Sequence, residues 1–329
     1  MRGAEGVAPA TRERVLAAVA AVGYRPNVLA RNLVQRRTTT VGIVVGDLAN
    51  PIFSELAKLA EQRLSAAGLA AMICNTDGQP ASEQEKVETL LEHRVAGILM
   101  LQYSGEPSTL ARLRAAGTAV AIVSQWESGA DCVVLDERRG AELAVGHLLD
   151  LGHRRIAYLS SELVELSTDT ARLDGYGRAL EQYQVERDPD LVVRLGHPGH
   201  LRSNDAVRTA IVRLTRLRLP ATAIFASNDL LAVDVLETVE ELGLRVPDDI
   251  SVVGFDDIRV AGLTRISLTT VAQPCEELAR IGIELLLARI EDASGPQRHR
   301  LLAPSLVVRS STAPPLRGEG DVADRLPRT

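Results

Sequence analysis

The sequence predicts an α/β protein built from two parallel, doubly wound sheets, and three observations lead to that fold class. Short Val-, Ile- and Leu-rich runs alternate with longer segments of helical period. The runs are nearly continuously apolar, which is typical of parallel strands covered by helices on both faces. Two series of such runs follow one another along 329 residues, a length sufficient for two hydrophobic cores.

The strand-like runs are short and well separated. The first series comprises 41–47, 69–75, 97–102, 119–124 and 132–136, and the second comprises 155–160, 191–195, 222–227 and 250–257. Between the runs, apolar residues recur every three or four positions, as at Leu56, Ala60 and Leu64. We therefore expect helices that join successive parallel strands through right-handed crossovers.

The order of the segments predicts discontinuous domains. A helical stripe over 274–290 follows the second series of strands, which indicates that the chain returns there to the first domain. The sequence LGHRRIAYL at 151–159 marks the first boundary. The predicted subdomains are 39–152 with about 273–297, and 153–272 with about 298–313. The remaining residues, 314–329, are rich in Pro, Gly and charge and are predicted to be disordered.

The first 38 residues differ in charge from the rest of the chain. They carry seven Arg against Glu5 and Glu13, a net +5 within a chain whose formal net charge is −6. A basic head on an acidic body suggests that the head meets a polyanion. Within it, 11–23 has an apolar stripe and a closing Gly23, and 27–38 forms a second short helix that Asn27 can cap.

Several classes of protein are disfavoured by composition. No apolar run of 18 residues exists, so no membrane span or membrane partner is expected, and the first nine residues lack the apolar core of a signal peptide. Cys74, Cys132 and Cys275 are too dispersed for a metal site or a disulfide framework, and they suit reduced cytoplasmic thiols. His197 and His200 lack a partnered Cys or carboxylate, so a plain loop without metal is expected.

Catalysis and a cofactor are not expected either. The first strand and its turn, VGIVVGDLANP, lack the glycines of a dinucleotide-binding turn. The sequence contains neither a phosphate-binding Walker loop nor a nucleophile elbow. We therefore predict a binding protein rather than an enzyme.

Motifs distributed over the whole chain resemble the LacI/GalR repressor family. They are VAPATRERVLAAVAAVGYRPNVLARNLVQRRTTTVGIVV at the start, NPIF (50–53), LGHRRIAYL, ARLDGY (171–176), SNDLLA (227–232), VPDDISVVGFDD (246–257) and LVVRSSTAPP (306–315). The resemblance implies a DNA-binding transcriptional regulator, normally a repressor, with two periplasmic-binding-protein-like subdomains and a small-molecule effector between them. It also implies a homodimer whose hinge helices pair over the minor groove of operator DNA.

One departure from the family concerns its helix-turn-helix. Residues 1–26 match only the third helix of the family's DNA-binding domain, and MRGAEG stands where the loop after the reading helix would be. Reading of base edges needs an element in the major groove. Either the start codon is assigned too late or the chain is an effector module, and for the chain as given we expect weak or no specific operator binding.

The hinge, 27–38, carries the remaining DNA-binding candidates. By resemblance, Leu33 wedges between base pairs in the minor groove, where arginines neutralise phosphates. The alternative is that Leu33 is an ordinary apolar contact in a dimer linker. The hinge candidates are Tyr24, Arg25, Asn27, Ala30, Arg31 and Leu33.

The effector-binding candidates follow strand-like runs, where the carboxyl ends of parallel strands bind ligands. By resemblance, Arg172 and Asp256 hold hydroxyls or polar ring atoms of the effector, and a carboxylate and a guanidinium suit that chemistry. The alternatives are that Asp256 caps the next helix and that Arg172 pairs with Asp169 or Asp174.

Four further residues complete the predicted site. Phe53 and Trp126 could stack on a ring, or be a core residue and a surface or dimer contact respectively. Asn228 and Asp229 could contact the effector or cap helix 230–242. The family often has Asp where this chain has Ser124-Gln125, and an aromatic near His197, so an unusual effector is expected, most plausibly a sugar or sugar derivative.

A solute-binding protein without DNA binding shares the expected fold and is the alternative function. The Arg-rich head argues against it, because YRPNVLARNLVQRRT (24–38) has no use in solute transport.

Overall fold

The computed structural model describes the chain in two compact units, 1–39 and 40–329. The described residues are 9–21, 38–123, 125–160, 167–195 and 204–316. In the first unit they form one helix, α1 (Pro9–Ala21), which confirms the predicted helix over its described length. Gly23, residues 27–37 of the predicted hinge and the tail from 317 lie outside the described residues.

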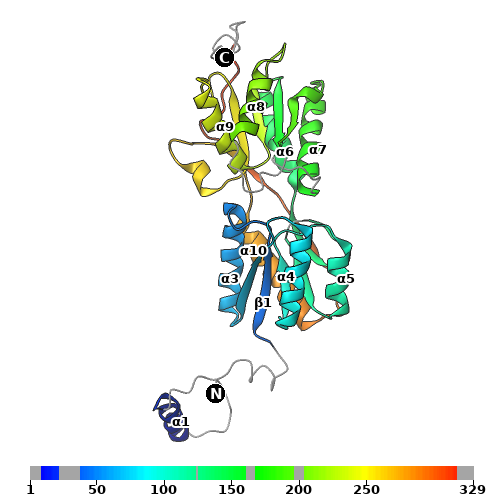
Figure 1. Ribbon diagram of the computed structural model, residues 1–329, viewed down its shortest axis with the longest axis vertical. Helices are drawn as coiled ribbons and strands as arrows, with labels where there is room; N and C mark the ends of the chain where they lie inside the picture. Colours follow the sequence, from blue (N-terminus) through cyan, green and yellow to red (C-terminus); the bar gives the residue numbers. More distant parts are fainter. Residues whose placement is uncertain (1–8, 22–37, 124, 161–166, 196–203, 317–329) are drawn as a thin grey trace. The chain divides into compact units, whose positions relative to one another are not determined.

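The second unit contains two six-stranded sheets, each wrapped by helices (Figure 1). The first sheet has the order β11-β5-β4-β3-β1-β2, and its strands pair in parallel. Its strands are β1 (Thr40–Val45), β2 (Ala70–Asn75), β3 (Gly97–Met100), β4 (Ala119–Ile122), β5 (Asp131–Leu135) and β11 (His299–Leu302).

The second sheet has the order β12-β10-β9-β8-β6-β7 and is parallel except for β12, which runs antiparallel to β10. Its strands are β6 (Ile156–Ser160), β7 (Val192–Arg194), β8 (Ala223–Ala226), β9 (Ser251–Asp256), β10 (Thr269–Ala272) and β12 (Ser305–Val307).

Helices cover both faces of each sheet, as the continuous apolar strands require. The helices α3 (Pro51–Ala66), α4 (Pro80–Glu92), α5 (Pro107–Ala115) and α10 (Cys275–Glu291) contact the first sheet. The helices α7 (Ser167–Gln182), α8 (Asn204–Thr215) and α9 (Asp229–Glu241) surround the second sheet together with α6 (Glu137–Asp150). Among the described helices none is long and apolar enough to cross a membrane.

All nine predicted strands are present within two residues of their predicted starts and ends. The prediction missed β10, β11 and β12. These strands have three or four residues each, and β11 and β12 lie at sheet edges, so neither carries a continuous buried run. Edge strands of that length leave little apolar pattern in a sequence.

The first crossing between the sheets lies after β5, not at the predicted boundary of 152. Helix α6 packs on α7 and on strands of the second sheet. Two glycines permit this close packing: a Cβ at Gly140 would lie 2.7 Å from the Phe255 ring, and one at Gly175 would lie 2.2 Å from the Arg138 carbonyl oxygen. The apolar stripe of α6 showed that the helix is buried, but not which sheet it covers.

The last crossing also differs from the prediction. Strand β11 pairs with β5 in the first sheet, so the chain crosses after Leu302 rather than near 298. The middle crossing lies between β10 and α10, at Gln273 and Pro274. Three segments therefore connect the sheets, and those after β5 and β10 leave the carboxyl ends of their strands.

A buried histidine ties the end of the described chain to the second sheet. His153 is 1% exposed, and its Nε2 donates to the Ala313 carbonyl oxygen at 2.9 Å while its Nδ1 lies 2.9 Å from the Thr222 hydroxyl. Because a carbonyl only accepts, the neutral tautomer with hydrogen on Nε2 satisfies this contact. Burial lowers the pKa of His153 below its ordinary value of 6.5.

This arrangement predicts a loss of stability in mild acid. The folded protein favours neutral His153, so its contribution is complete above pH 6.5 and declines as the unfolded chain takes up a proton below that value. His153→Gln should lower the free energy of unfolding by about 1–3 kcal/mol at pH 7.5 and flatten its fall between pH 6.5 and 5. Denaturant unfolding at a series of pH values measures both effects.

His93→Gln is the matched control, because His93 is exposed at the end of α4. An unchanged acid slope in His153→Gln would refute this account of His153.

Candidate effector site

The candidate site lies at the carboxyl ends of the strands of the second sheet. Ser160 ends β6, Ser227 directly follows β8, Asp256 ends β9 and Gln273 directly follows β10. Polar residues therefore end four neighbouring parallel strands at one edge of the sheet, where ligands of open α/β sheets bind.

Arg172 lies on α7 and is held there by three contacts. Its Nε donates to Glu137 Oε2 at 2.8 Å, its Nη1 donates to the Ser227 carbonyl oxygen, and its guanidinium lies 3.9 Å from the centre of the Phe255 ring. The side chains of Arg172 and Glu137 are only 12% and 11% exposed. A planar guanidinium that is stacked on one face and bonded at its edge has one defined orientation.

The alternative pairing of Arg172 within its own helix is wrong. Asp174 binds Arg138 and Arg178 on the exposed side of α7. Asp169 accepts hydrogen bonds from the hydroxyls of Tyr158 and Ser160. Glu137, at the first residue of α6, is the partner that the sequence did not reveal.

Asp256 occupies a strained backbone position at the end of β9. Its φ is 121°, and the φ of Asp257 is 55°, so two consecutive non-glycine residues have positive φ. Such strain persists where surrounding contacts hold it, and it clusters at binding sites. The Asp256 Oδ1 accepts a hydrogen bond from Gln273 Nε2 at 2.7 Å. Asp256 does not cap the short helix at 259–262, whose N-cap residue is Ile258, so the capping alternative is wrong.

Burial and the charges around Asp256 shift its ionisation. Burial raises the pKa of Asp256 to about 8, against the lowering effect of Arg172 and with a further rise from Asp229. For Arg172, burial lowers the pKa, but the carboxylates of Glu137 and Asp256 outweigh it and the net shift is upward. Each of Arg172 and Asp256 is thus within electrostatic reach of the other, so the structure brings the two main predicted residues together.

Asn228 and Asp229 have structural partners. The Asn228 Oδ1 accepts from the Leu231 amide and caps α9, as the alternative proposed. Asp229 is the first residue of that helix and is fully buried; it accepts from the Ile258 amide at 2.9 Å and the Thr270 hydroxyl at 2.5 Å. Burial raises the pKa of Asp229 to about 7. With both oxygens engaged, Asp229 supports the β9 turn rather than facing a ligand.

The two predicted aromatic residues have different environments. Phe53 is partly buried near the start of α3, where it packs against the core. Trp126 is 47% exposed, and its ring centre lies 5.0 Å from that of His299, the first residue of β11. That contact is at the amino end of β11, away from Arg172 on α7 and from Asp256 at the end of β9, so the structure does not bring Trp126 to the predicted site.

Two buried polar atoms next to this cluster have no hydrogen-bond partner. They are Asp169 Oδ2 and Ser227 Oγ, in residues that are 3% and 4% exposed. Asp169 precedes Arg172 by three residues on α7 and so shares its helix face. The position of Ser227 after an apolar strand was a usable sequence signal, whereas Asp169 appeared in the sequence only as a candidate partner of Arg172.

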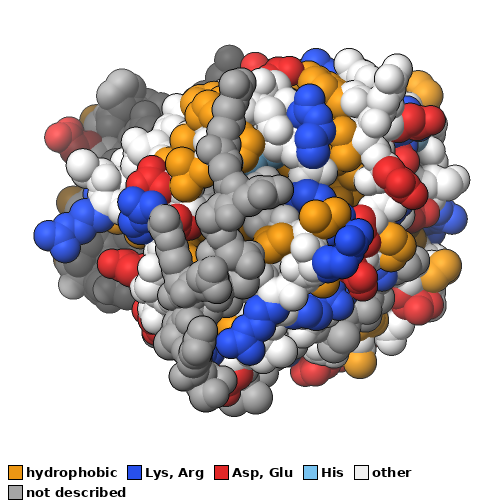
Figure 2. Space-filling model, turned by 90° about the horizontal axis from the view of Figure 1, so that it is seen from above, with side chains coloured by type: hydrophobic (Ala, Val, Ile, Leu, Met, Phe, Trp, Pro, Cys, Tyr) orange, Lys and Arg blue, Asp and Glu red, His pale blue; other side chains and the backbone are white. Residues whose placement is uncertain are grey.

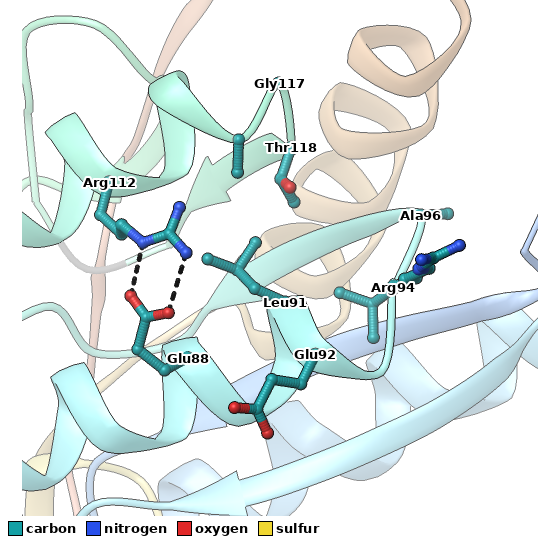
Figure 3. A pocket seen from close by; sticks show the side chains of 10 residues that line it. Glu88, Leu91, Glu92, Arg94, Ala96, Arg112, Gly117 and Thr118 are labelled. Atoms are coloured by element: carbon teal, nitrogen blue, oxygen red, sulfur yellow. Dashed lines mark hydrogen bonds and ion pairs between the residues drawn. The ribbon is translucent and has the colours of Figure 1, made fainter.

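Two cavities among the described residues lie elsewhere. One, of about 430 Å³, is formed by the ends of α4 and α5 and the turns that follow them, where Arg112 Nε and Nη2 bind Glu88 at 2.6 and 3.0 Å (Figure 3). It lies at the amino ends of β3 and β4, at the edge of the first sheet opposite its strand tips. The other, of about 590 Å³, is lined by residues of β7 and α8.

The DNA-binding candidates and the predicted histidine loop cannot be placed in this site. Within the described ranges no cluster of three His, Cys, Asp or Glu could hold a metal ion. On the face shown in Figure 2, basic and acidic side chains are interspersed. The candidates outside the described residues are Tyr24, Arg25, Asn27, Ala30, Arg31, Leu33, His197 and His200.

The raised pKa of Asp256 predicts that this carboxylate weakens the fold at alkaline pH. A carboxyl group with a folded pKa above its unfolded value contributes favourably in acid and loses that contribution as pH rises through the folded pKa. Asp256→Asn keeps the acceptor for Gln273 and removes the buried charge. It should therefore raise the free energy of unfolding by about 1–3 kcal/mol at pH 8.5, with a smaller gain at pH 5.

Denaturant unfolding at the two pH values tests this, with Glu61→Gln on the exposed side of α3 as control. A variant that is less stable than the parent at pH 8.5 would show that the Asp256 charge stabilises the site instead.

Comparison with known proteins agrees with this architecture. Residues 145–312 match the model of a periplasmic binding protein-like domain. The chain is 33% identical over 308 residues to the HTH-type transcriptional repressor PurR of Photobacterium profundum, covering 93% of this chain and 90% of that protein. It is 31% identical to the ribose operon repressor of Haemophilus influenzae, covering 94% and 92%.

Solved structures give the same result. A LacI family transcriptional regulator from Enterococcus faecium with bound ribose has a TM-score of 0.74 and 30% identity, covering 84% of this chain and 99% of that one. The regulator CelR in complex with cellobiose has a TM-score of 0.74 and 29% identity, covering 94% and 93%. These relatives are regulators rather than enzymes. With its two parallel-dominated sheets and polar strand ends, this chain belongs to the LacI/GalR family of transcriptional regulators and carries that family's periplasmic-binding-protein-like effector domain.

Proposed function

We propose that this protein is a transcriptional repressor whose affinity for operator DNA is set by a sugar or sugar derivative bound by Arg172 and Asp256. The observation that carries the proposal is the burial of these two side chains within electrostatic reach of each other, with Arg172 on α7 and Asp256 at the end of β9. A guanidinium donates to ring or hydroxyl oxygens and a carboxyl group accepts from hydroxyls, so together they match the acceptor and donor roles of sugar hydroxyls.

The neighbouring elements support a ligand of this kind. Phe53, near the start of α3, offers an apolar surface from the first sheet's side. Helix α10 packs on α3. At its first residue, burial raises the pKa of Cys275, with a further rise from the charges of Asp256 and Glu55, which supports an approach of α3 and α10 to the end of β9. Relatives of similar fold bind ribose and cellobiose, and both ligands present hydroxyls around an apolar ring face.

The proposed mechanism is allosteric. The effector is gripped where two of the three crossing segments leave their strands, so binding changes the relation of the two sheets. That change pairs or separates the hinge helices of a homodimer and thereby alters operator affinity in the cytoplasm. The effector and the DNA then bias one two-state element, as linkage requires.

This proposal predicts that Arg172→Ala removes effector binding. The variant loses the donor to the ligand and also leaves the buried Glu137 carboxylate unpaired, so the thermal shift given by a binding sugar should vanish and affinity should fall about 100-fold or more. Differential scanning fluorimetry with a sugar panel identifies the ligand, and calorimetry measures the affinities of parent and variant.

Arg112→Ala is the matched control, because it also breaks an arginine–glutamate pair but lies at the Glu88 cavity. Equal sugar affinity in the parent and Arg172→Ala would refute the site. A sugar that binds without altering retention of selected duplex DNA by the purified protein would favour a solute-binding module.

A further inference from the structure

Asp169 and Ser227 are the buried polar residues that the arrangement around Arg172 leaves incomplete. Asp169 is 3% exposed, and its Oδ1 receives the Ser160 hydroxyl at 2.7 Å and the Tyr158 hydroxyl. Its Oδ2 has no partner. A buried carboxylate oxygen without a donor costs about 1–3 kcal/mol, so a donor supplied from outside the protein would be strongly favoured.

Ser227, which also contacts Arg172, carries the second buried polar atom without a hydrogen-bond partner. Its carbonyl oxygen accepts from the Arg172 guanidinium, while its buried hydroxyl has no partner. Asp169 Oδ2 accepts only, and the Ser227 hydroxyl both donates and accepts. A ligand hydroxyl can satisfy either atom, and a sugar can satisfy both at once.

The charges around Arg172 restrict the ligand further. The guanidinium of Arg172 is already bonded to Glu137, and Asp169 lies one helical turn before it on α7. Burial raises the pKa of Asp256 to about 8 and that of Asp229 to about 7, so these two groups add less negative charge near neutral pH. Arg309, beside the β9 turn, is paired with Asp257 at 2.6 Å. An anionic ligand would therefore meet the carboxylates of Glu137 and Asp169 and a guanidinium whose charge is already compensated.

We infer that Asp169 is a further effector-contacting residue, which with Ser227 receives hydroxyls of an uncharged, polyhydroxylated ligand, and that the site rejects phosphorylated or carboxylated analogues. This inference rests on the proposed function, because it concerns the same site. It adds two ligand contacts, from Asp169 and Ser227. It also restricts the ligand to uncharged molecules, which Arg172 and Asp256 alone do not.

The test begins with ligand charge. Uncharged sugars (D-ribose, D-galactose, D-glucose and cellobiose) and the 5- or 6-phosphates of the monosaccharides are compared by thermal shift on the full chain, and each binder is measured by calorimetry. An uncharged sugar should bind at least about 10-fold tighter than its phosphate. A phosphate ester that binds as tightly as its parent sugar overturns the charge inference.

The second arm tests the contacts with Asp169→Asn and Ser227→Ala, using Glu181→Gln, an exposed acid near the end of α7, as control. Asp169→Asn should weaken the binding sugar about 10- to 100-fold and Ser227→Ala about 3- to 10-fold, with no change in the control. A structural role for Asp169 would weaken every analogue equally. If Asp169 contacts one ligand hydroxyl, the analogue that lacks this hydroxyl should bind the parent and Asp169→Asn with nearly the same affinity.

The outcomes separate this inference from the proposed function. Loss of binding in Arg172→Ala with parental affinity in Asp169→Asn leaves the function standing and removes Asp169 from the site. An equal loss for all deoxy analogues in Asp169→Asn also overturns the contact. If none of the sugars or phosphates binds, the proposed function itself fails.

Discussion

The pairing of Arg172 with Glu137 is the interaction on which the site depends. Both side chains are largely removed from solvent, and a buried charge is tolerated only when it is paired and hydrogen-bonded. The pair is supported by the Ser227 carbonyl, which accepts from Nη1, and by the Phe255 ring, which lies against one face of the guanidinium. The guanidinium is consequently fixed before any ligand arrives, so little conformational entropy is lost on binding.

The same pair depends on the packing of helices. Glu137 lies beside Arg172 only because α6 approaches α7 and β9 closely, and Gly140 and Gly175 leave the space for that approach. A side chain at Gly175 would collide with the backbone of α6 at Arg138. Packing far from the strand ends therefore determines the geometry at the strand ends.

Buried carboxyl groups at this edge of the second sheet lower the stability of the fold. Asp229 and Asp256 are both buried, and burial raises the pKa of each carboxyl group. Asp256 also has a positive φ. Asp229 is compensated by the Ile258 amide and the Thr270 hydroxyl, which hold the turn after β9. Asp256 accepts a side-chain hydrogen bond from Gln273. Asp256 is therefore the less compensated of the two carboxyl groups, and under the proposed function it contacts the ligand. Stability and binding oppose each other at this residue.

The sequence predicted the strands and the covering helices, because hydrophobic periodicity is a local signal. Arg172 and Asp256 were named as effector contacts by resemblance to the LacI/GalR family, and that role stays a prediction. The sequence did not predict that α6 covers the second sheet, since an apolar stripe does not identify the surface that buries it. The sequence did not reveal the roles of Glu137 and Asp169 for the same reason, because these roles arise from contacts between separate elements. Trp126 was misplaced because a strand's end does not reveal where an eight-residue loop returns.

The position of Glu137 also gives the site a short connection to the first sheet. Asp136 caps α6 by accepting from the Arg139 amide, and it directly follows β5, whose strand belongs to the first sheet. Arg172 is therefore bonded to the residue next to a crossing segment, and Asp256 is bonded to Gln273 in another. A ligand that draws on either side chain acts within one or two residues of the connections between the sheets, so no extended chain of contacts is needed to couple occupancy to their relative arrangement.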